Sequence, residues 1–289
     1  MLKELLNVYV PLLSGLLFSY LYKPRQEEVA LFARIVLYVF LTPLLFTSTY
    51  IRLSETQDFS VINLSILSSI LVLISFTLAR RLFGQGELVL TTMYANAGYI
   101  PLGIARSLWG ITGVTSVGFY VLGNNFTSNI LATLYLSKRR DKNPVERLLK
   151  FPLLHAILLA LIFVVFKLQI PGIILEPVST LGNAALTVAL VQLGVEAGSH
   201  LNFSPAYALK TYGVRLATAI PVTWLFILLE LITGVDSRVA IIETVMPSAV
   251  SCVVIARELG LDATTTAGIV FVTTLISTFV FLPIVLLLI

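Results

Sequence analysis

An apolar stretch of the sequence is interrupted at residues 94–103, which read Tyr-Ala-Asn-Ala-Gly-Tyr-Ile-Pro-Leu-Gly. Asparagine, two glycines and a proline are unfavourable inside a continuous helix, because proline lacks an N–H group and glycine permits unwound backbone. A second apolar stretch carries Met-Pro-Ser-Ala-Val-Ser at residues 246–251. Irregular backbone at membrane depth is tolerated only where protein or a water-filled cavity covers it. Simple proline kinks are the alternative, but two interruptions in corresponding places favour a pair of broken helices at a binding site.

The composition places these interruptions in a membrane protein. Of 289 residues, 57% are hydrophobic and 12% are charged, with a mean hydropathy of +0.96. Soluble domains are about 45–50% apolar and about 25% charged, so the composition excludes a soluble enzyme, a disordered chain and a nucleic-acid binder. The single cysteine, Cys252, excludes a disulfide framework and a multi-thiolate metal site. With no Walker motif, metal-ligand cluster or nucleophile–base pair visible, we expect neither an enzyme nor a cofactor.

Apolar windows bounded by charges or by Gly/Pro clusters predict ten transmembrane helices. They fall near residues 5–22, 29–50, 59–79, 87–108, 112–137, 151–169, 173–198, 207–233, 238–258 and 264–288. The predicted fold class is therefore an all-α membrane protein that crosses the cell membrane several times. Its basic residues gather in alternate connections, with 12 on one side of the membrane against 5 on the other. Because short basic loops stay cytoplasmic, we expect both termini outside and residues 138–150 to form a cytoplasmic linker.

Several motifs recur at an offset of about half the chain. Residues 104–108, Ile-Ala-Arg-Ser-Leu, return as Ile-Ala-Arg-Glu-Leu at 255–259, and Gly110, Thr115 and Gly118 match residues 150 positions later. Five spans per half is an odd number, so the two halves must insert in opposite directions. This predicts an inverted repeat, typical of secondary transporters, with five helices in residues 1–137 and five in residues 151–289.

The two interruptions predict a site for a carboxylate. If one span stops near Asn96 and restarts near Pro101, and Pro247 starts the first turn of a second half-helix, unbonded N–H groups and the positive ends of two helix dipoles converge. Ser248 and Ala249 would offer N–H groups, and Asn96 an amide. The full set expected to bind substrate is Asn96, Ala97, Gly98, Pro101, Asn125, Pro247, Ser248, Ala249 and Ser251.

Other polar residues within the spans allow two interpretations. Glu243, one turn before Pro247, is a candidate coupling residue that carries a proton, although pairing with Arg238 is an equal alternative. The amides of span five, Asn124, Asn125 and Asn129, line a substrate path or bond neighbouring helices. Arg215 lies near a predicted span end, where snorkelling or pairing is expected.

At these residues the chain resembles the auxin efflux carrier family, which includes the plant PIN proteins. Residues 96–105 resemble that family's Asn-Thr-Gly-x-x-Gly-x-Pro-x-Ala segment, with Pro101 and Gly103 exchanged relative to it. Residues 247–250, Pro-Ser-Ala-Val, followed by Ala256-Arg257, resemble its Pro-Thr-Ala-Val…Ala-Arg run, although Ser251 stands where many members have Asn. The short loop at 138–150 is similar to that of the prokaryotic branch.

The resemblance implies ten helices in two inverted five-helix repeats, with the broken helices four and nine crossing. It implies a scaffold of helices 1, 2, 6 and 7 that forms a homodimer, and a transport domain of helices 3–5 and 8–10. An elevator-type movement of a small organic anion through the lipid membrane is implied, with dicarboxylates such as malate or malonate for prokaryotic relatives. Two alternatives remain: a sodium-coupled symporter of the bile-acid type, and a membrane-embedded sensor without flux.

Overall fold

The computed structural model describes residues 2–136, 151–199 and 205–289, and all regular elements in these ranges are helices. The fold class is thus all-α. Five helical runs are long and apolar enough to cross a membrane, namely Gln26–Thr56, Phe59–Leu82, Gly172–Gly198, Pro205–Leu228 and Ala263–Leu288. The basic linker predicted at 138–150 lies outside the described residues.

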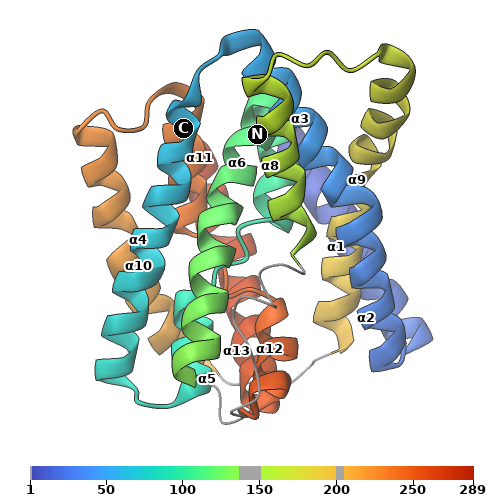
Figure 1. Ribbon diagram of the computed structural model, residues 1–289. Coiled ribbons are helices and arrows are strands. Elements are labelled where there is room, and N and C mark those ends of the chain that lie inside the picture. The colour runs from blue at the N-terminus through green and yellow to red at the C-terminus, as the bar shows by residue number, and fades with distance from the viewer. Residues whose placement is uncertain (1, 137–150, 200–204) are drawn as a thin grey trace. The chain divides into compact units, whose positions relative to one another are not determined.

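The helices occupy the apolar windows of the sequence (Figure 1). The first half contains α1 Leu2–Tyr22, α2 Gln26–Ile35, the π-helical η1 Val36–Leu41, α3 Thr42–Thr56, η2 Phe59–Val61, α4 Ile62–Leu82, α5 Gly86–Met93, α6 Tyr99–Leu131 and η3 Ala132–Leu136. The second contains α8 Pro152–Val165, α9 Gly172–Ser199, α10 Pro205–Leu228, α11 Gly234–Thr244, α12 Ser251–Leu259, α13 Ala263–Ile276, η4 Ser277–Phe281 and α14 Leu282–Leu288. The windows at 87–108 and 238–258 each divide into two helices, as the interruptions predicted.

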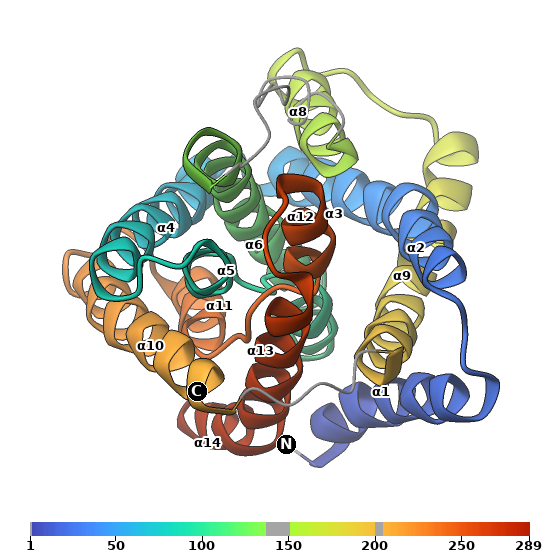
Figure 2. The same cartoon turned by 90° about the horizontal axis from the view of Figure 1, so that it is seen from below.

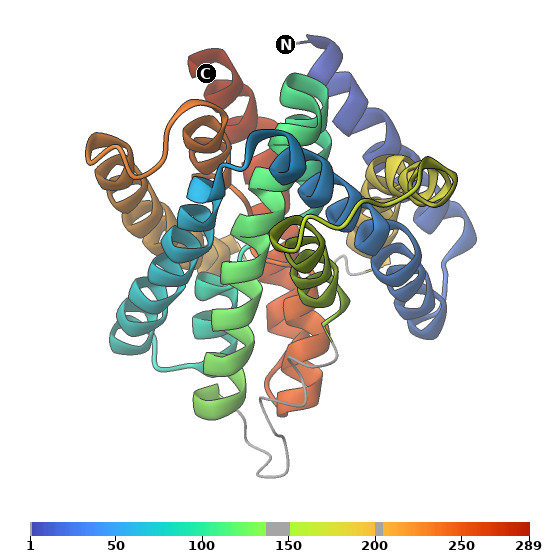
Figure 3. The same cartoon turned by 45° about the horizontal axis from the view of Figure 1, so that its top comes forward.

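The chain forms two compact units, and each is described by itself. The first comprises the described residues within 1–61, 98–119 and 150–199. In it α1, α2 and α3 pack along α9 (Figure 3), and α8 packs on α3. Glycines let α1 and α9 approach closely, because a Cβ on Gly15 would overlap the Val191 carbonyl and one on Gly194 would overlap the Leu12 carbonyl.

A sharp kink at Gly110 divides α6. Its φ of 59° and ψ of −137° suit glycine and strain other residues. The chain folds back tightly here, since a Cβ on Gly113 would lie 2.5 Å from the Ala105 carbonyl oxygen. The kink therefore falls between the windows predicted for spans four and five.

The second unit comprises the described residues within 62–97, 120–149 and 200–289. In it α10 packs against α4, α5, α11 and α13, and Figure 2 shows α10 beside α5 and α11. Buried hydroxyl groups join some of these helices, for example Ser75 and Thr218, whose Oγ and Oγ1 atoms lie 2.8 Å apart. Both helix breaks reach into this unit, and they carry the candidate site.

Candidate functional site

The first break separates α5 from α6. The last helical bond of α5 runs from the Tyr94 N–H to the Leu90 carbonyl (3.1 Å), after which Tyr94 becomes extended, with φ −100° and ψ 106°. Helix resumes at Tyr99, two residues before the restart expected near Pro101. Pro101 lies in the first turn of α6, where a missing N–H costs little. The restart is therefore predicted to within two residues, whereas α5 ends at Met93, three residues before the stop expected near Asn96.

The second break separates α11 from α12 and occupies residues 245–250. Pro247 lies inside the break, so its predicted role in the first turn of a helix is wrong. The physical reason is that Pro247 and Ala249 are held in backbone pairing with the first break, which delays the start of α12 to Ser251.

The two breaks pair with each other as a short antiparallel bridge. The Asn96 N–H donates to the Pro247 carbonyl (2.8 Å), and the Ala249 N–H donates to the Tyr94 carbonyl (2.9 Å). Ala95 and Ser248 stand opposite each other between these bonds. Unwound backbone in a membrane protein needs internal partners, and each break supplies them to the other. The Ala249 N–H, which the sequence suggested would be unbonded, is used in this pairing.

Asn124 completes the hydrogen bonding of Ala95. The Ala95 N–H donates to Asn124 Oδ1 (3.4 Å), and Asn124 Nδ2 donates to the Ala95 carbonyl (3.1 Å). The side chain is 2% exposed and lies in α6. It thus replaces the neighbouring strand that Ala95 lacks on that side. The sequence identified Asn124 only as one of three amides, because the need for a backbone clamp appears only once the break is paired.

Ser248 is fixed on the opposite side of the bridge. Its N–H donates to Thr273 Oγ1 (3.3 Å) in α13, and its Oγ donates to the Thr91 carbonyl (2.7 Å) in α5. The hydroxyl and the N–H of Ser248, both offered to a substrate in the sequence interpretation, therefore have partners within the protein. Thr91 and Thr273 were not singled out, since buried threonines occur throughout apolar helices.

Unused donors remain beside the bridge. Asn96 is 4% exposed, and its Nδ2 has no hydrogen-bond partner among the described residues. At the start of α12, the N–H groups of Val250 and Ser251 donate no hydrogen bond to any described residue. A buried unpaired donor is costly, whereas a helix N-terminus attracts anions. Both features suit a ligand with negatively charged oxygen atoms.

The remaining predicted residues are divided between the two units. Asn125 is half-buried, and its Oδ1 accepts a hydrogen bond from Asn124 Nδ2 (3.2 Å), so the structure brings it next to the clamp. Ala97 is buried in the first break, and Ser251 is exposed. Gly98 and Pro101 belong to the first unit, where the Gly98 carbonyl accepts the Leu102 N–H (2.9 Å).

Comparison with known proteins indicates the class of protein in which this arrangement occurs. Residues 142–285 match a family model described as membrane transport protein. An uncharacterized transporter of Methanocaldococcus jannaschii is 27% identical over 271 residues, which cover 88% of this chain and 87% of the relative. Another, of Methanothermobacter thermautotrophicus, is 28% identical over 290 residues, covering 95% and 94%. The chain thus resembles membrane transporters of the prokaryotic branch of the auxin efflux carrier family. It is a multi-pass membrane transporter.

One carboxylate of this transporter is fully buried. Glu243, in the last turn of α11, is 0% exposed, and neither carboxylate oxygen has a hydrogen-bond partner among the described residues. The alternative pairing with Arg238 is therefore not formed, and Arg238 is exposed. Arg215 is 5% exposed, so of the two alternatives expected for this residue, snorkelling is not observed. The described residues contain no cluster of His, Cys, Asp and Glu able to hold a metal ion.

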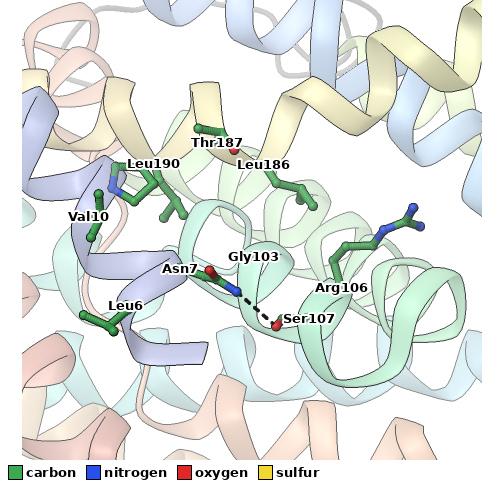
Figure 4. A pocket seen from close by; sticks show the side chains of 10 residues that line it. Leu6, Asn7, Val10, Gly103, Arg106, Ser107, Leu186, Thr187 and Leu190 are labelled. Atoms are coloured by element: carbon green, nitrogen blue, oxygen red, sulfur yellow. Dashed lines mark hydrogen bonds between the residues drawn. The ribbon is translucent and has the colours of Figure 1, made fainter. Parts of the chain in front are cut away.

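The transporter also has a cavity of about 460 Å³ within its first unit (Figure 4). Its polar lining includes Arg106, whose Nη2 donates to Asn183 Oδ1 (2.9 Å), and Asn7, whose Nδ2 lies 3.5 Å from Ser107 Oγ. Apolar residues of α1, α6 and α9 complete the wall. The cavity has the volume of a small-molecule site. No sequence pattern indicates it, because its residues lie on three separate helices.

Proposed function

We propose that this protein is a secondary transporter that moves small organic carboxylate anions across the cell membrane. The observation that carries the proposal is the paired break: a buried, unpartnered Asn96 amide lies in the same hydrogen-bonded bridge that leads into the N-terminus of α12. These groups offer N–H donors and a positive dipole end without a fixed cation. A carboxylate would satisfy the Asn96 donor and the first N–H groups of α12 together.

The bridge also suits a substrate site whose hydrogen-bond donors keep their relative positions during transport. Asn124 and Thr273 hold its two strands from α6 and α13, so the donors are fixed relative to each other before a substrate arrives. Pre-organised donors bind an anion without the cost of ordering them. A carboxylate rather than a larger polyanion fits, because only a few donors are unused beside the bridge.

We further propose the elevator-type architecture of the resemblance. Ten spans would form two inverted repeats, with a dimer-forming scaffold from helices 1, 2, 6 and 7 and a transport domain from helices 3–5 and 8–10. The recurrence of a broken helix in each half supports the repeat, and the excess of basic residues in alternate connections supports placing both termini outside.

Ligand-dependent thermal stability tests the substrate class. Purified wild-type protein is warmed with single organic acids, including malonate and malate, with and without sodium. A binder stabilises the folded state by mass action. We expect stabilisation by at least one carboxylate without sodium, and a loss of binding free energy of about 1–2 kcal/mol in Asn96→Ala, as when one charge-assisted hydrogen bond is removed.

Asn63→Ala is the matched control, because it removes an amide of the same unit whose Nδ2 bonds the Leu231 carbonyl (2.7 Å), away from both breaks. Its binding should equal that of the wild type. Equal affinity of Asn96→Ala and wild type for every stabilising acid would remove the bridge as the substrate site. Stabilisation only with sodium would favour the sodium-coupled alternative.

A further inference from the structure

Arg215 and Glu243 lie buried in the second unit without hydrogen bonds that would satisfy their charges. Nε and Nη1 of Arg215, and both carboxylate oxygens of Glu243, have no partner among the described residues. The two side chains are near enough for their charges to interact, yet no hydrogen bond joins them. Removing an unpaired charge from water is costly. If the two side chains served only stability, we would expect a direct hydrogen-bonded salt bridge between them. This arrangement therefore calls for a function.

The pair lies directly beside the second break. Glu243 belongs to the last turn of α11, and the Val245 carbonyl that ends this helix accepts hydrogen bonds from Tyr212 Oη (2.6 Å) and Ser277 Oγ (2.5 Å). Tyr212 is three residues before Arg215 on α10, which places both on one face of that helix. The pair and the bridge are thus built on the same short piece of backbone.

The two side chains differ in whether they can change their charge by binding or releasing a proton. A guanidinium group keeps its proton in proteins, so Arg215 supplies a constant positive charge. A carboxylate at a helix C-terminus faces the negative end of the dipole and, at Glu243, finds no donor. The neutral carboxylic acid is the form that such surroundings accept most easily. A proton on Glu243 therefore switches the pair from neutral to a single positive charge.

We propose that Glu243 is a proton-binding site coupled to the substrate, and that Arg215 is the fixed counter-charge that makes its proton and the anion bind together. This inference rests on the proposed function. With the proton bound, the positive charge of the pair offsets one negative charge of an anion at the bridge. With the proton and the anion both absent, the Arg215 and Glu243 charges offset each other. Either state avoids an uncompensated charge in the membrane interior.

The charges around the pair favour a proton over a metal cation. A hard cation requires several oxygen ligands, whereas Glu243 has a permanently positive neighbour in Arg215. The other titratable groups near Arg215 are Tyr120 of α6, Tyr212 of α10 and Cys252 of α12. The helix α14, which also packs against α11, has no titratable residue. Asp236 lies two turns earlier on α11 itself.

Infrared difference spectroscopy of the protein in lipid tests the proton site without any anion. Between acid and alkaline buffers, the wild type should lose the carbonyl band of a buried carboxylic acid, and Glu243→Gln should lack that band at every pH. In Arg215→Gln the band should persist in buffers that deprotonate the wild type. Glu230→Gln, which alters an exposed glutamate of the same unit, should retain the wild-type band. An unchanged spectrum in Glu243→Gln would overturn the proposal.

Transport of radiolabelled malonate into proteoliposomes tests the coupling. Wild-type vesicles should accumulate malonate when the proton concentration is higher outside, and Glu243→Gln should lose this response while still exchanging internal for external malonate. Accumulation by Glu243→Gln at the wild-type level would contradict the coupling. Absence of any malonate movement in the wild type would count against the proposed function with this anion, and the infrared result would still decide the proton site.

Discussion

Replacement of Asn124 by alanine removes the clamp that holds the first break. The Ala95 N–H and the Ala95 carbonyl would both lose their bonds to Asn124, and both are buried. Each orphaned backbone group costs about 1–3 kcal/mol, less what a relaxed structure recovers. Two such groups predict a loss of stability of roughly 2–4 kcal/mol for Asn124→Ala. At about 2–4 °C per kcal/mol for a domain of this size, the melting temperature should fall by roughly 5–15 °C.

Thermal unfolding in one detergent, followed by tryptophan fluorescence, measures this loss. Asn129→Ala is the control, because its half-buried amide bonds only Tyr94 Oη (3.2 Å) and the Asn125 carbonyl (2.8 Å) and leaves no orphaned N–H in the break. Its melting temperature should fall by much less. If Asn124→Ala and Asn129→Ala melted together close to the wild type, the clamp would not be supporting the break.

Further predictions concern glycines, a helix cap and pH. Gly194→Ala should lower the melting temperature, because the added Cβ would overlap the Leu12 carbonyl. Gly213→Ala, on α10 with open space around it, should raise the stability by about 0.5–1 kcal/mol. If Gly194→Ala were the more stable variant, the close packing of α1 on α9 would be refuted. Gly110→Ala should cost about 1–3 kcal/mol through its positive φ of 59°, and an unchanged melting temperature would contradict the kink. Hydrogen bonds from the Thr265 hydroxyl and from backbone N–H groups lower the pKa of Asp262, the N-cap of α13. Its stabilisation is therefore complete above the unfolded pKa and lost as pH falls through the folded one, so Asp262→Ala should cost about 1 kcal/mol at neutral pH and match the wild type in acid. A gap that persists in acid would exclude this cap as the cause.

The helices and the sites of the breaks were predictable from local sequence. Apolar windows give the helices because burial in lipid or protein demands them, and Asn96, Gly98 and Pro101 mark a place where helix is costly. The start of α12 was not predictable in the same way. Pro247 by itself suits a first helical turn, whereas in the structure its carbonyl pairs with Asn96, far away in the chain, and α12 begins only at Ser251.

The roles of polar side chains were the least predictable. Asn124, Thr91 and Thr273 serve backbone groups that have no helical partner, and these groups exist only after both breaks have formed. Arg215 lies near the end of an apolar window, where long basic side chains usually reach the interface. Its burial depends on the arrangement of α10 against neighbouring helices, which the sequence of α10 alone does not specify.

The most direct test of the proposed site is a structure determined with the carboxylate that gives the largest thermal stabilisation. The account predicts anion density within hydrogen-bond distance of Asn96 Nδ2, with its oxygen atoms toward the N–H groups of Val250 and Ser251. Density for the anion in the cavity beside Arg106 instead, with Asn96 still unpartnered, would contradict the assignment of the paired breaks as the substrate site.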